Sequence, residues 1–224
     1  MSDGTVPVVV IGAGGHGRET VLLISQIAAH GGSWRVIGFL DDNKSLHGNI
    51  IAGLPVLGGL ELLQELTQET SVALGMGSPA AKRSILSRLP HTSRLASLVH
   101  PSVLIGDRVR IDCGTQIHAG TIITCDVVIG SAVTINRHCD ISHDVVLGDY
   151  CTLAPSVSLA GNVQIDHDTD VGLGARIIPG VRVGARSVIG AGAVVVSDLP
   201  ASCVAIGVPA RVARLINDAQ TEIR

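Results

Sequence analysis

The chain has 224 residues, which is enough for one large domain or two small ones. Because 46% of its residues are hydrophobic and only 16% are charged, the composition indicates folded domains rather than disorder. Its 16 basic and 19 acidic residues give a net charge of −3, which excludes the strongly basic signature of a nucleic-acid-binding protein. The chain shows no apolar run of roughly 20 residues, no signal-peptide pattern and no Cys-x-x-Cys pair among its five cysteines, so we expect a cytoplasmic protein without a membrane span, a disulfide framework or a metal.

The first 96 residues alternate between strand-like and helix-like segments, which indicates a small parallel α/β domain. It is too short to hold two complete mononucleotide-binding halves. The predicted elements, in chain order, are a buried strand over 8–11, a helix over 18–29, a strand over 35–40, a helix over 60–66, a strand over 72–74 and a helix over 79–89.

A glycine-rich turn follows the first predicted strand. Gly12, Gly14 and Gly17 fit the pattern G-x-G-x-x-G, and Asp41 stands at the end of the second predicted strand. Glycines let a backbone approach phosphate, and the helix N-terminus that follows favours an anion. Three interpretations stay open here: a NAD site, a tight turn without a ligand, or a site for a nucleotide other than NAD, which the compact His16 beside the glycines favours.

A repeat of six residues governs the chain over 97–199. An aliphatic residue stands at every sixth position from Val99 to Val195, seventeen times without a break, and a small or β-branched residue follows four positions later. This period fits neither an amphipathic helix nor a long alternating strand, but it fits a solenoid with triangular coils of 18 residues. A narrow bore explains why only 1% of the chain is aromatic.

The solenoid needs covered ends and has exposed flanks. The N-terminal domain is expected to cap one end, and residues 200–224, with a helix-like stretch over 211–220, the other. Because no long loop interrupts the repeat, its flat flanks predict packing into a symmetric homotrimer.

Motifs along nearly the whole chain resemble one family, the bacterial nucleotide-sugar acetyltransferases, which join a Rossmann-like domain to a left-handed parallel β-helix. Its members include UDP-4-amino-sugar and GDP-perosamine N-acetyltransferases and sialic acid O-acetyltransferases. The motifs are Ile11-Gly12-Ala13-Gly14-Gly15-His16-Gly17, Phe39-Leu40-Asp41-Asp42, Ala73-Leu74-Gly75, Asn136 with Ser142-His143-Asp144, Ala160-Gly161-Asn162, and Gly207-Val208-Pro209-Ala210-Arg211.

The resemblance implies roles for individual residues. His143 matches the catalytic histidine, Asp144 the acid that supports it, and Gly161 an amide near the thioester carbonyl of acetyl-CoA. The remaining assignments are nucleotide-sugar contacts at Gly14, Gly15, His16, Asp41, Asp42 and Gly75, a polar contact near the acceptor sugar at Asn136, and acetyl-CoA contacts at Thr152, Leu173 and Ala191.

The repeat supports His143 independently of the resemblance. It stands two residues after Ile141 on the outward part of a coil, with Cys125 one coil below and Gly161 one coil above. The missing side chain at Gly161 is expected to leave room for a substrate beside the imidazole. A neighbouring carboxylate stabilises a charged histidine, as a general base requires.

The other histidines, the cysteines and the late arginines receive weaker interpretations. Surface, entry-turn or solvated positions are expected for His100, His118, His138, His167, Arg176, Arg182, Arg186 and Arg211. Cys139 and Cys151 occupy the inward position of the repeat, and nothing marks Cys113 or Cys125 as an activated thiolate, so a covalent acyl-cysteine is not expected.

The sequence therefore predicts an enzyme that moves acetyl from acetyl-CoA to the amino group of a nucleotide-linked amino sugar, at sites between protomers. Two alternatives stay open. One is O-acetylation of a free sugar such as sialic acid, and the other is a non-catalytic NAD-binding β-helix protein.

Overall fold

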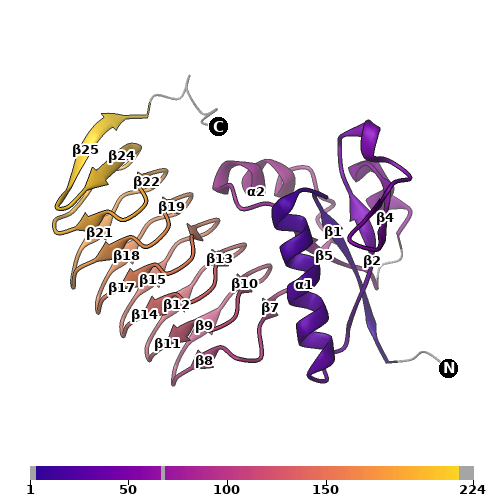
Figure 1. The fold of residues 1–224 in the computed structure, drawn as a ribbon, viewed down its shortest axis with the longest axis horizontal. Coiled ribbons are helices and arrows are strands. Elements are labelled where there is room, and N and C mark those ends of the chain that lie inside the picture. The colour runs from indigo at the N-terminus through magenta and orange to yellow at the C-terminus, as the bar shows by residue number, and fades with distance from the viewer. Residues whose placement is uncertain (1–3, 67–68, 217–224) are drawn as a thin grey trace. The chain divides into compact units, whose positions relative to one another are not determined.

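The computed structural model describes residues 4–66 and 69–216 and divides into two compact units. One unit comprises Met1–Gly77 with Ala81–Pro101, and the other comprises Ser78–Ala80 with Ser102–Arg224. We call them the α/β unit and the solenoid and describe each by itself (Figure 1).

A six-stranded sheet with the order β3-β4-β2-β1-β5-β6 forms the framework of the α/β unit. Its strands pair in parallel, except that β3 runs antiparallel to β4. The elements are β1 (Val6–Ile11), α1 (Gly15–Ala29), β2 (Trp34–Leu40), η1 (Lys44–Leu46), β3 (Ile50–Ile51), β4 (Leu54–Gly58), η2 (Leu60–Gln64), β5 (Ser71–Leu74), α2 (Pro79–Leu86), β6 (Arg94–Leu95) and β7 (Leu98–Val99).

The central strand β1 is apolar at consecutive positions because both of its faces are covered. Val8 and Val10 join a cluster that includes Leu23 and Ile24 of α1, whereas Val9 joins a second cluster on the opposite face of the sheet. The predicted α/β character is therefore confirmed. Residues 60–66, expected to be helical, contain only the short 3₁₀ helix η2, and the sequence did not predict β3, β4 or β6.

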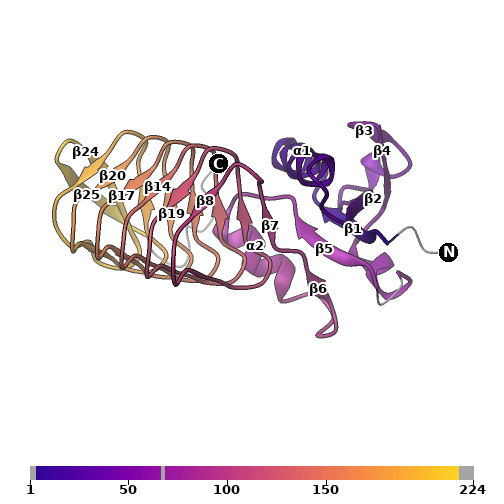
Figure 2. The ribbon, with the colours of Figure 1, turned by 90° about the horizontal axis from the view of Figure 1, so that it is seen from below.

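The solenoid consists of stacked coils whose two-residue strands recur every 18 residues in three sheets (Figure 2). The β8 sheet contains β8 (Leu104–Ile105), β11 (Ile122–Ile123), β14 (Asp140–Ile141), β17 (Ser158–Leu159), β20 (Arg176–Ile177) and β23 (Val194–Val195). The β9 sheet contains β9 (Arg110–Ile111), β12 (Val128–Ile129), β15 (Val146–Leu147), β18 (Gln164–Ile165) and β21 (Arg182–Val183). The β10 sheet contains β10 (Gln116–Ile117), β13 (Thr134–Ile135), β16 (Thr152–Leu153), β19 (Asp170–Val171) and β22 (Val188–Ile189), followed by β24 (Cys203–Gly207) and β25 (Ala210–Leu215).

The interior of the coils follows the six-residue repeat. Ile129, Ile141 and Val171 are fully shielded, as are small inward residues such as Thr121 and Cys139. The buried hydroxyl of Thr121 donates to the carbonyl of Asn136 at 3.0 Å, so this inward polar group is satisfied. The predicted parallel β-helix, with its core of aliphatic rather than aromatic side chains, is confirmed.

The C-terminal segment departs from the prediction. Residues 210–215 form the strand β25, which pairs antiparallel with β24, and β24 in turn pairs in parallel with β22. The helix expected over 211–220 is therefore wrong where the structure describes it, and residues 217–220 lie outside the described residues. The physical reason is that β24 would otherwise lie at the edge of its sheet. Its outer backbone N–H and C=O groups pair with a second strand, and these hydrogen bonds favour a strand over a short isolated helix.

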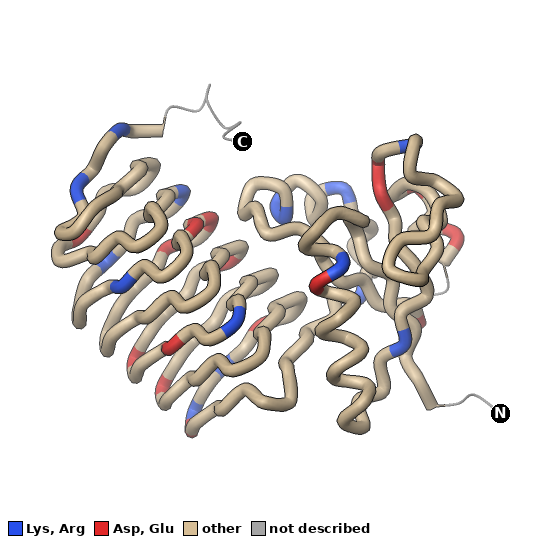
Figure 3. Tube along the Cα trace, viewed as in Figure 1, with Lys and Arg blue, Asp and Glu red and all other residues tan. Residues whose placement is uncertain are grey.

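Neither a large patch of one charge sign nor a membrane-spanning helix stands out in the part of the chain that the structure describes. Figure 3 shows acidic and basic residues interspersed along both units rather than gathered by sign. Within residues 4–66 and 69–216, no helix is long and apolar enough to span a bilayer.

Candidate active site

The turn between β14 and β15 presents an imidazole backed by a carboxylate. The Nδ1 atom of His143 lies 2.7 Å from Oδ2 of Asp144, and more than half of each side chain is exposed. Asp144 has a φ of 60°, a left-handed conformation that the tight turn requires. When Nδ1–H donates to the carboxylate, Nε2 is the ring atom able to accept a proton. The pair has the geometry of a general base and its supporting acid.

The His143 ring lies against the next coil at Gly161. The amide of Asn162 donates to the carbonyl of His143 at 2.9 Å, and a Cβ added to Gly161 would fall on the imidazole. The imidazole itself thus occupies the space that a side chain at residue 161 would take, and the expected room for a substrate beside the ring stays a prediction. Glycine at this position fixes where the imidazole can lie.

The coil below His143 carries Cys125 and Asp126. The thiol of Cys125 has a raised pKa, first because of desolvation and then because of the Asp126 carboxylate beside it. A raised pKa disfavours the thiolate, in agreement with the prediction that no acyl-cysteine forms. Asp126 makes a two-pronged ion pair with Arg108, at 2.6 Å to Nε and 2.8 Å to Nη2.

A second histidine–aspartate pair occupies the matching turn at another corner of the coils. His167 Nδ1 lies 2.9 Å from Oδ2 of Asp168, which has a φ of 58°. His167 is as exposed as His143, but the side chain of Asp168 is only 5% exposed, against 53% for Asp144. The sequence prediction placed His167 on the surface without its acid. Its signal was the same His-Asp step two residues after an aliphatic position.

Two of the predicted contacts are buried in the solenoid. The side-chain amide of Asn136 donates to the carbonyl of Leu153 at 2.9 Å, and this residue is only 8% exposed. Thr152 is 7% exposed. The amide of Asn136 thus already takes part in the packing of neighbouring coils.

Leu173 and Ala191 are exposed in consecutive coils, where the β10 sheet turns into the β8 sheet. His143 and Gly161 lie where the β8 sheet turns into the β9 sheet. The structure therefore brings His143, Asp144 and Gly161 together at one corner and Leu173 and Ala191 at another. One side of the triangle separates the two groups within a single chain.

The glycines in and beside the glycine-rich turn differ in the space around their Cα atoms. A Cβ on Gly17 would collide with the carbonyl of Gly12, and a Cβ on Gly75 would lie 2.6 Å from the same oxygen. By contrast, among residues 4–66 and 69–216 a Cβ on Gly14 would meet no atom within 4 Å, and a Cβ on Gly15 would only touch the tip of Arg18 at 4.0 Å. Gly17 and Gly75 are thus needed for packing, whereas Gly14 and Gly15 are open to approach from outside.

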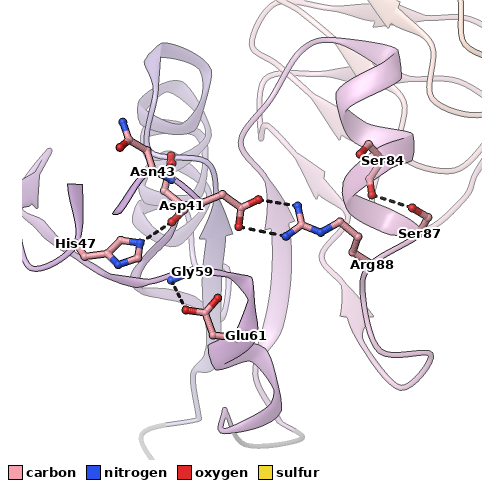
Figure 4. A network of polar contacts seen from close by, with 9 residues as sticks. Asp41, Asn43, His47, Gly59, Glu61, Ser84, Ser87 and Arg88 are labelled. Carbon is pink, nitrogen blue, oxygen red and sulfur yellow. Dashed lines mark hydrogen bonds and ion pairs between the residues drawn. The ribbon is translucent and has the colours of Figure 1, made fainter. Parts of the chain in front are cut away.

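Asp41 braces this turn from the end of β2. Its Oδ2 accepts the amide of Ala13 at 2.9 Å, and its Oδ1 accepts the amide of Asn43 at 2.8 Å. The imidazole of His47 lies 2.8 Å from the backbone carbonyl of Asp41 (Figure 4). Both carboxylate oxygens are therefore engaged in shaping the turn.

Asp42 is held by a residue that the sequence prediction missed. Arg88 spans its carboxylate with two hydrogen bonds of 2.6 and 3.2 Å. The Arg88 guanidinium holds the pKa of Asp42 below its usual range. The two partners are 46 positions apart, and no local sequence pattern links them.

His16 is the most enclosed of the predicted nucleotide contacts on α1. Its side chain is 16% exposed, and Nδ1 lies 3.6 Å from the Glu19 carboxylate. Burial lowers the pKa of His16, with Glu19 opposing the shift and Lys82 adding to it. The ring is accordingly neutral near pH 7 and borders an open hollow with Gly15, Arg18, Glu19 and Leu22.

The described ranges 4–66 and 69–216 contain no group of three or more His, Cys, Asp or Glu side chains that could hold a metal. Cys139 is buried, which raises its pKa to about 11, and Cys151 is buried as well, as the packing role predicts.

Comparisons with known proteins place these features in context. Residues 7–89 match the family model described as the PglD N-terminal domain. GDP-perosamine N-acetyltransferase of Escherichia coli O157:H7 is 33% identical over 175 residues, which cover 77% of this chain and 78% of that protein. The chain belongs to the bacterial nucleotide-sugar acetyltransferase family, which includes the GDP-perosamine N-acetyltransferases.

Solved structures of other acetyltransferases share the architecture of the family. The perosamine N-acetyltransferase of Caulobacter crescentus, crystallised as a histidine-to-asparagine variant with CoA and GDP-perosamine, superposes with a TM-score of 0.84 at 34% identity, covering 93% of this chain and 97% of its own. The acetyltransferase domain of PglB from Neisseria gonorrhoeae, in complex with acetyl coenzyme A, gives a TM-score of 0.68 at 26% identity, covering 93% and 100%.

Membership of the family confirms three predictions. These are the resemblance itself, the fold of a Rossmann-like domain followed by a left-handed parallel β-helix, and the class of enzyme, an acetyl-CoA-dependent sugar N-acetyltransferase. The use of acetyl-CoA as co-substrate is likewise confirmed at the level of the family.

Proposed function

We propose that this enzyme transfers acetyl from acetyl-CoA to the amino group of a nucleotide-linked amino sugar, such as a 4-amino-4,6-dideoxyhexose. The observation that carries the proposal is the His143–Asp144 pair, held at 2.7 Å against Gly161, in a chain whose relatives act on or bind GDP-perosamine. We also propose that the reaction takes place in the cytoplasm.

In this mechanism, His143 is the general base. As the sugar amine attacks the thioester carbonyl and forms the new C–N bond, Nε2 of His143 takes the proton that the nitrogen loses. Asp144 stabilises the imidazolium through its bond to Nδ1. The backbone amide of Gly161 stabilises the negative charge that develops on the carbonyl oxygen. The C–S bond then breaks, and the thiolate of CoA takes up a proton.

The two units divide the binding of the substrates in this proposal, with residues 1–96 as the nucleotide-sugar domain, 97–199 as the transferase domain and 200–224 as the capping tail. The nucleotide approaches Gly14 and Gly15, where the described residues leave the space around Gly14 open and only the tip of Arg18 comes near Gly15, beside the neutral ring of His16. Asp41, Asp42 and Gly75 shape that site. The remaining proposed contacts are Asn136 near the acceptor sugar and Thr152, Leu173 and Ala191 along acetyl-CoA.

We propose further that the enzyme is a homotrimer with its active sites between protomers. Within one chain, the corner with Leu173 and Ala191 is separated from the corner with His143. A neighbouring copy can therefore bring its own Leu173 and Ala191 to the corner with His143. Closed cyclic symmetry satisfies this requirement for every copy. Light scattering at micromolar concentration should give about 69 kDa, three chains of 23.0 kDa. A mass of a single chain in an active preparation would refute sites shared between protomers.

The proposed acceptor is tested by thiol release from acetyl-CoA. We expect turnover with GDP-perosamine or with a UDP- or dTDP-linked 4-amino sugar, and none with the same nucleotides linked to sugars that carry only hydroxyl groups. The free sugars serve as controls. Turnover with free sialic acid and not with any nucleotide-linked amine would establish the O-acetyltransferase alternative. NADH binding without thiol release from any acceptor would establish the non-catalytic one.

A further inference from the structure

An open hollow of about 570 Å³ lies beside the start of α1. Its lining residues are Gly15, His16, Arg18, Glu19 and Leu22. The volume falls within the range of sites that hold small molecules. Residues 15, 18 and 22 are three and four positions apart, so they follow one another along a single face of the helix. Gly15 and His16 are proposed nucleotide contacts, whereas Arg18 has no assigned role.

The N-terminus of α1 has no negative charge of its own. Gly14, the N-cap residue, has no side chain that could accept from the first N–H groups, and the sequence of the first turn contains no acid. The backbone N–H groups at the start of a helix carry partial positive charge, which favours an anion. The start of α1 is therefore positive on the side where Gly14 and Gly15 are open.

Arg18 adds a full positive charge at the same place. Its Nη2 atom lies 4.0 Å from the point that a Cβ on Gly15 would occupy, so the side chain folds back over the start of the helix. Within the ranges 4–66 and 69–216, its guanidinium makes no hydrogen bond or ion pair. Arg88 and Arg108, by contrast, each hold a carboxylate with two hydrogen bonds. The donors of Arg18 are thus available to a ligand in the hollow.

The acid that also lines the hollow, Glu19, is turned toward His16. Its carboxylate lies 3.6 Å from Nδ1 of His16, and its side chain is 43% exposed. Arg18 and Glu19 are consecutive residues of a helix, so their side chains leave α1 about 100° apart. The hollow therefore has a positive part at the start of α1 and a negative part beside His16.

We propose that Arg18 binds the diphosphate of the nucleotide-linked sugar, while the backbone N–H groups at the start of α1 hold the same phosphate oxygens from the other side. This rests on the proposed function, in which the nucleotide approaches Gly14 and Gly15. A planar guanidinium can donate to two phosphate oxygens at once. Because the base and the ribose do not contact Arg18 in this arrangement, the residue adds affinity for the diphosphate whichever base it carries.

The test compares a nucleoside diphosphate with its own nucleoside, using the full chain. GDP, UDP and dTDP are titrated calorimetrically, and the nucleoside of the tightest of the three is measured by displacement. We expect Arg18→Gln to weaken binding of that diphosphate by about tenfold and to change binding of the uncharged nucleoside by less than about twofold. Arg18→Lys, which keeps the charge but loses the fork, should fall between the two. Salt at 0.5 M should shrink the loss, because it screens the attraction.

The matched control is Arg35→Gln, which removes the same charge from the same unit. Arg35 lies near the amino end of β2, whereas α1 begins after the carboxyl end of β1, and the two strands are parallel. Its Nε donates to the hydroxyl of Thr5 at 3.3 Å. Diphosphate affinity should stay within about twofold of the unmodified protein, because salt screens a charge at the opposite edge of the sheet. A loss as large as that in Arg18→Gln would reveal a general effect of net charge and overturn the assignment.

Thiol release separates this inference from the proposed function. We expect KM for the nucleotide-linked amino sugar to rise about tenfold in Arg18→Gln, while kcat and KM for acetyl-CoA stay within about twofold. If diphosphate binding weakens as stated but the unmodified enzyme acetylates no nucleotide-linked amine, Arg18 binds diphosphate and the proposed acceptor is wrong. Equal losses for diphosphate and nucleoside, no loss for either, or no binding of any of the three diphosphates to the unmodified protein would overturn the role of Arg18, whatever the activity does.

Discussion

Replacing His143 with asparagine is expected to lower kcat by roughly 10²–10⁴-fold while KM for acetyl-CoA and for the nucleotide sugar changes little. Asparagine preserves the size and polarity of the side chain at this turn but has no atom that can take the amine proton at neutral pH. The Asp144 carboxylate, 2.7 Å away, then has no imidazolium to stabilise. Steady-state thiol release with both substrates varied measures the two constants.

The matched control is His167→Asn. It removes the same hydrogen-bonded pair, at 2.9 Å, from an equivalent turn at a different corner of the coils. Any general damage to the solenoid from losing a histidine–aspartate turn should therefore be shared by the two variants. We expect kcat within about twofold of the unmodified enzyme for His167→Asn. Near-normal kcat in His143→Asn, or an equal loss in both variants, would remove His143 from the proposed mechanism.

The two pairs also show why the repeat alone could not choose the base. Sequence spacing placed both histidines two residues after an inward aliphatic residue, on the outward part of a coil. The two histidines differ in the residue that faces them from the next coil. Gly161 leaves space for the ring of His143, whereas the corresponding position in the coil after His167 is Ala185. The motif Ala160-Gly161-Asn162 was informative because it described that neighbour, which is 18 residues away.

Prediction succeeded where one short period determines the packing. Each coil repeats the same pattern, so the sequence predicted the core at seventeen aliphatic positions, and the fourteen from Ile117 to Val195 are buried, whereas Ile105 in the first coil is 44% exposed. The 18-residue interval that aligns Arg108 with Asp126 was present in the sequence as well. It failed where a contact depends on tertiary pairing. The strand β25 forms because β24 offers an open edge, and Arg88 meets Asp42 across 46 residues. Neither partner carries a local signal for the other.

The glycine-rich turn gives the second large expected effect, on stability rather than rate. Gly17→Ala should lower the unfolding free energy of the α/β unit by about 3 kcal/mol, because the new methyl would overlap the backbone carbonyl of Gly12, which cannot move without displacing β1. Gly15→Ala should leave stability unchanged or raise it by up to about 1 kcal/mol, since alanine favours the helix and meets only the end of Arg18. Chemical denaturation followed by circular dichroism measures both.

The same two variants separate packing from recognition. If the open side of the turn receives the nucleotide sugar, the methyl of Gly15→Ala stands between the ligand and the first turn of α1, and the affinity should fall by about tenfold, a loss of about 1.4 kcal/mol, in a protein of full stability. Calorimetric titration with GDP-perosamine measures this loss. Unchanged affinity in Gly15→Ala would mean that the turn packs without a ligand, because the glycines that its packing needs are Gly12, Gly17 and Gly75, and Gly15 is not among them.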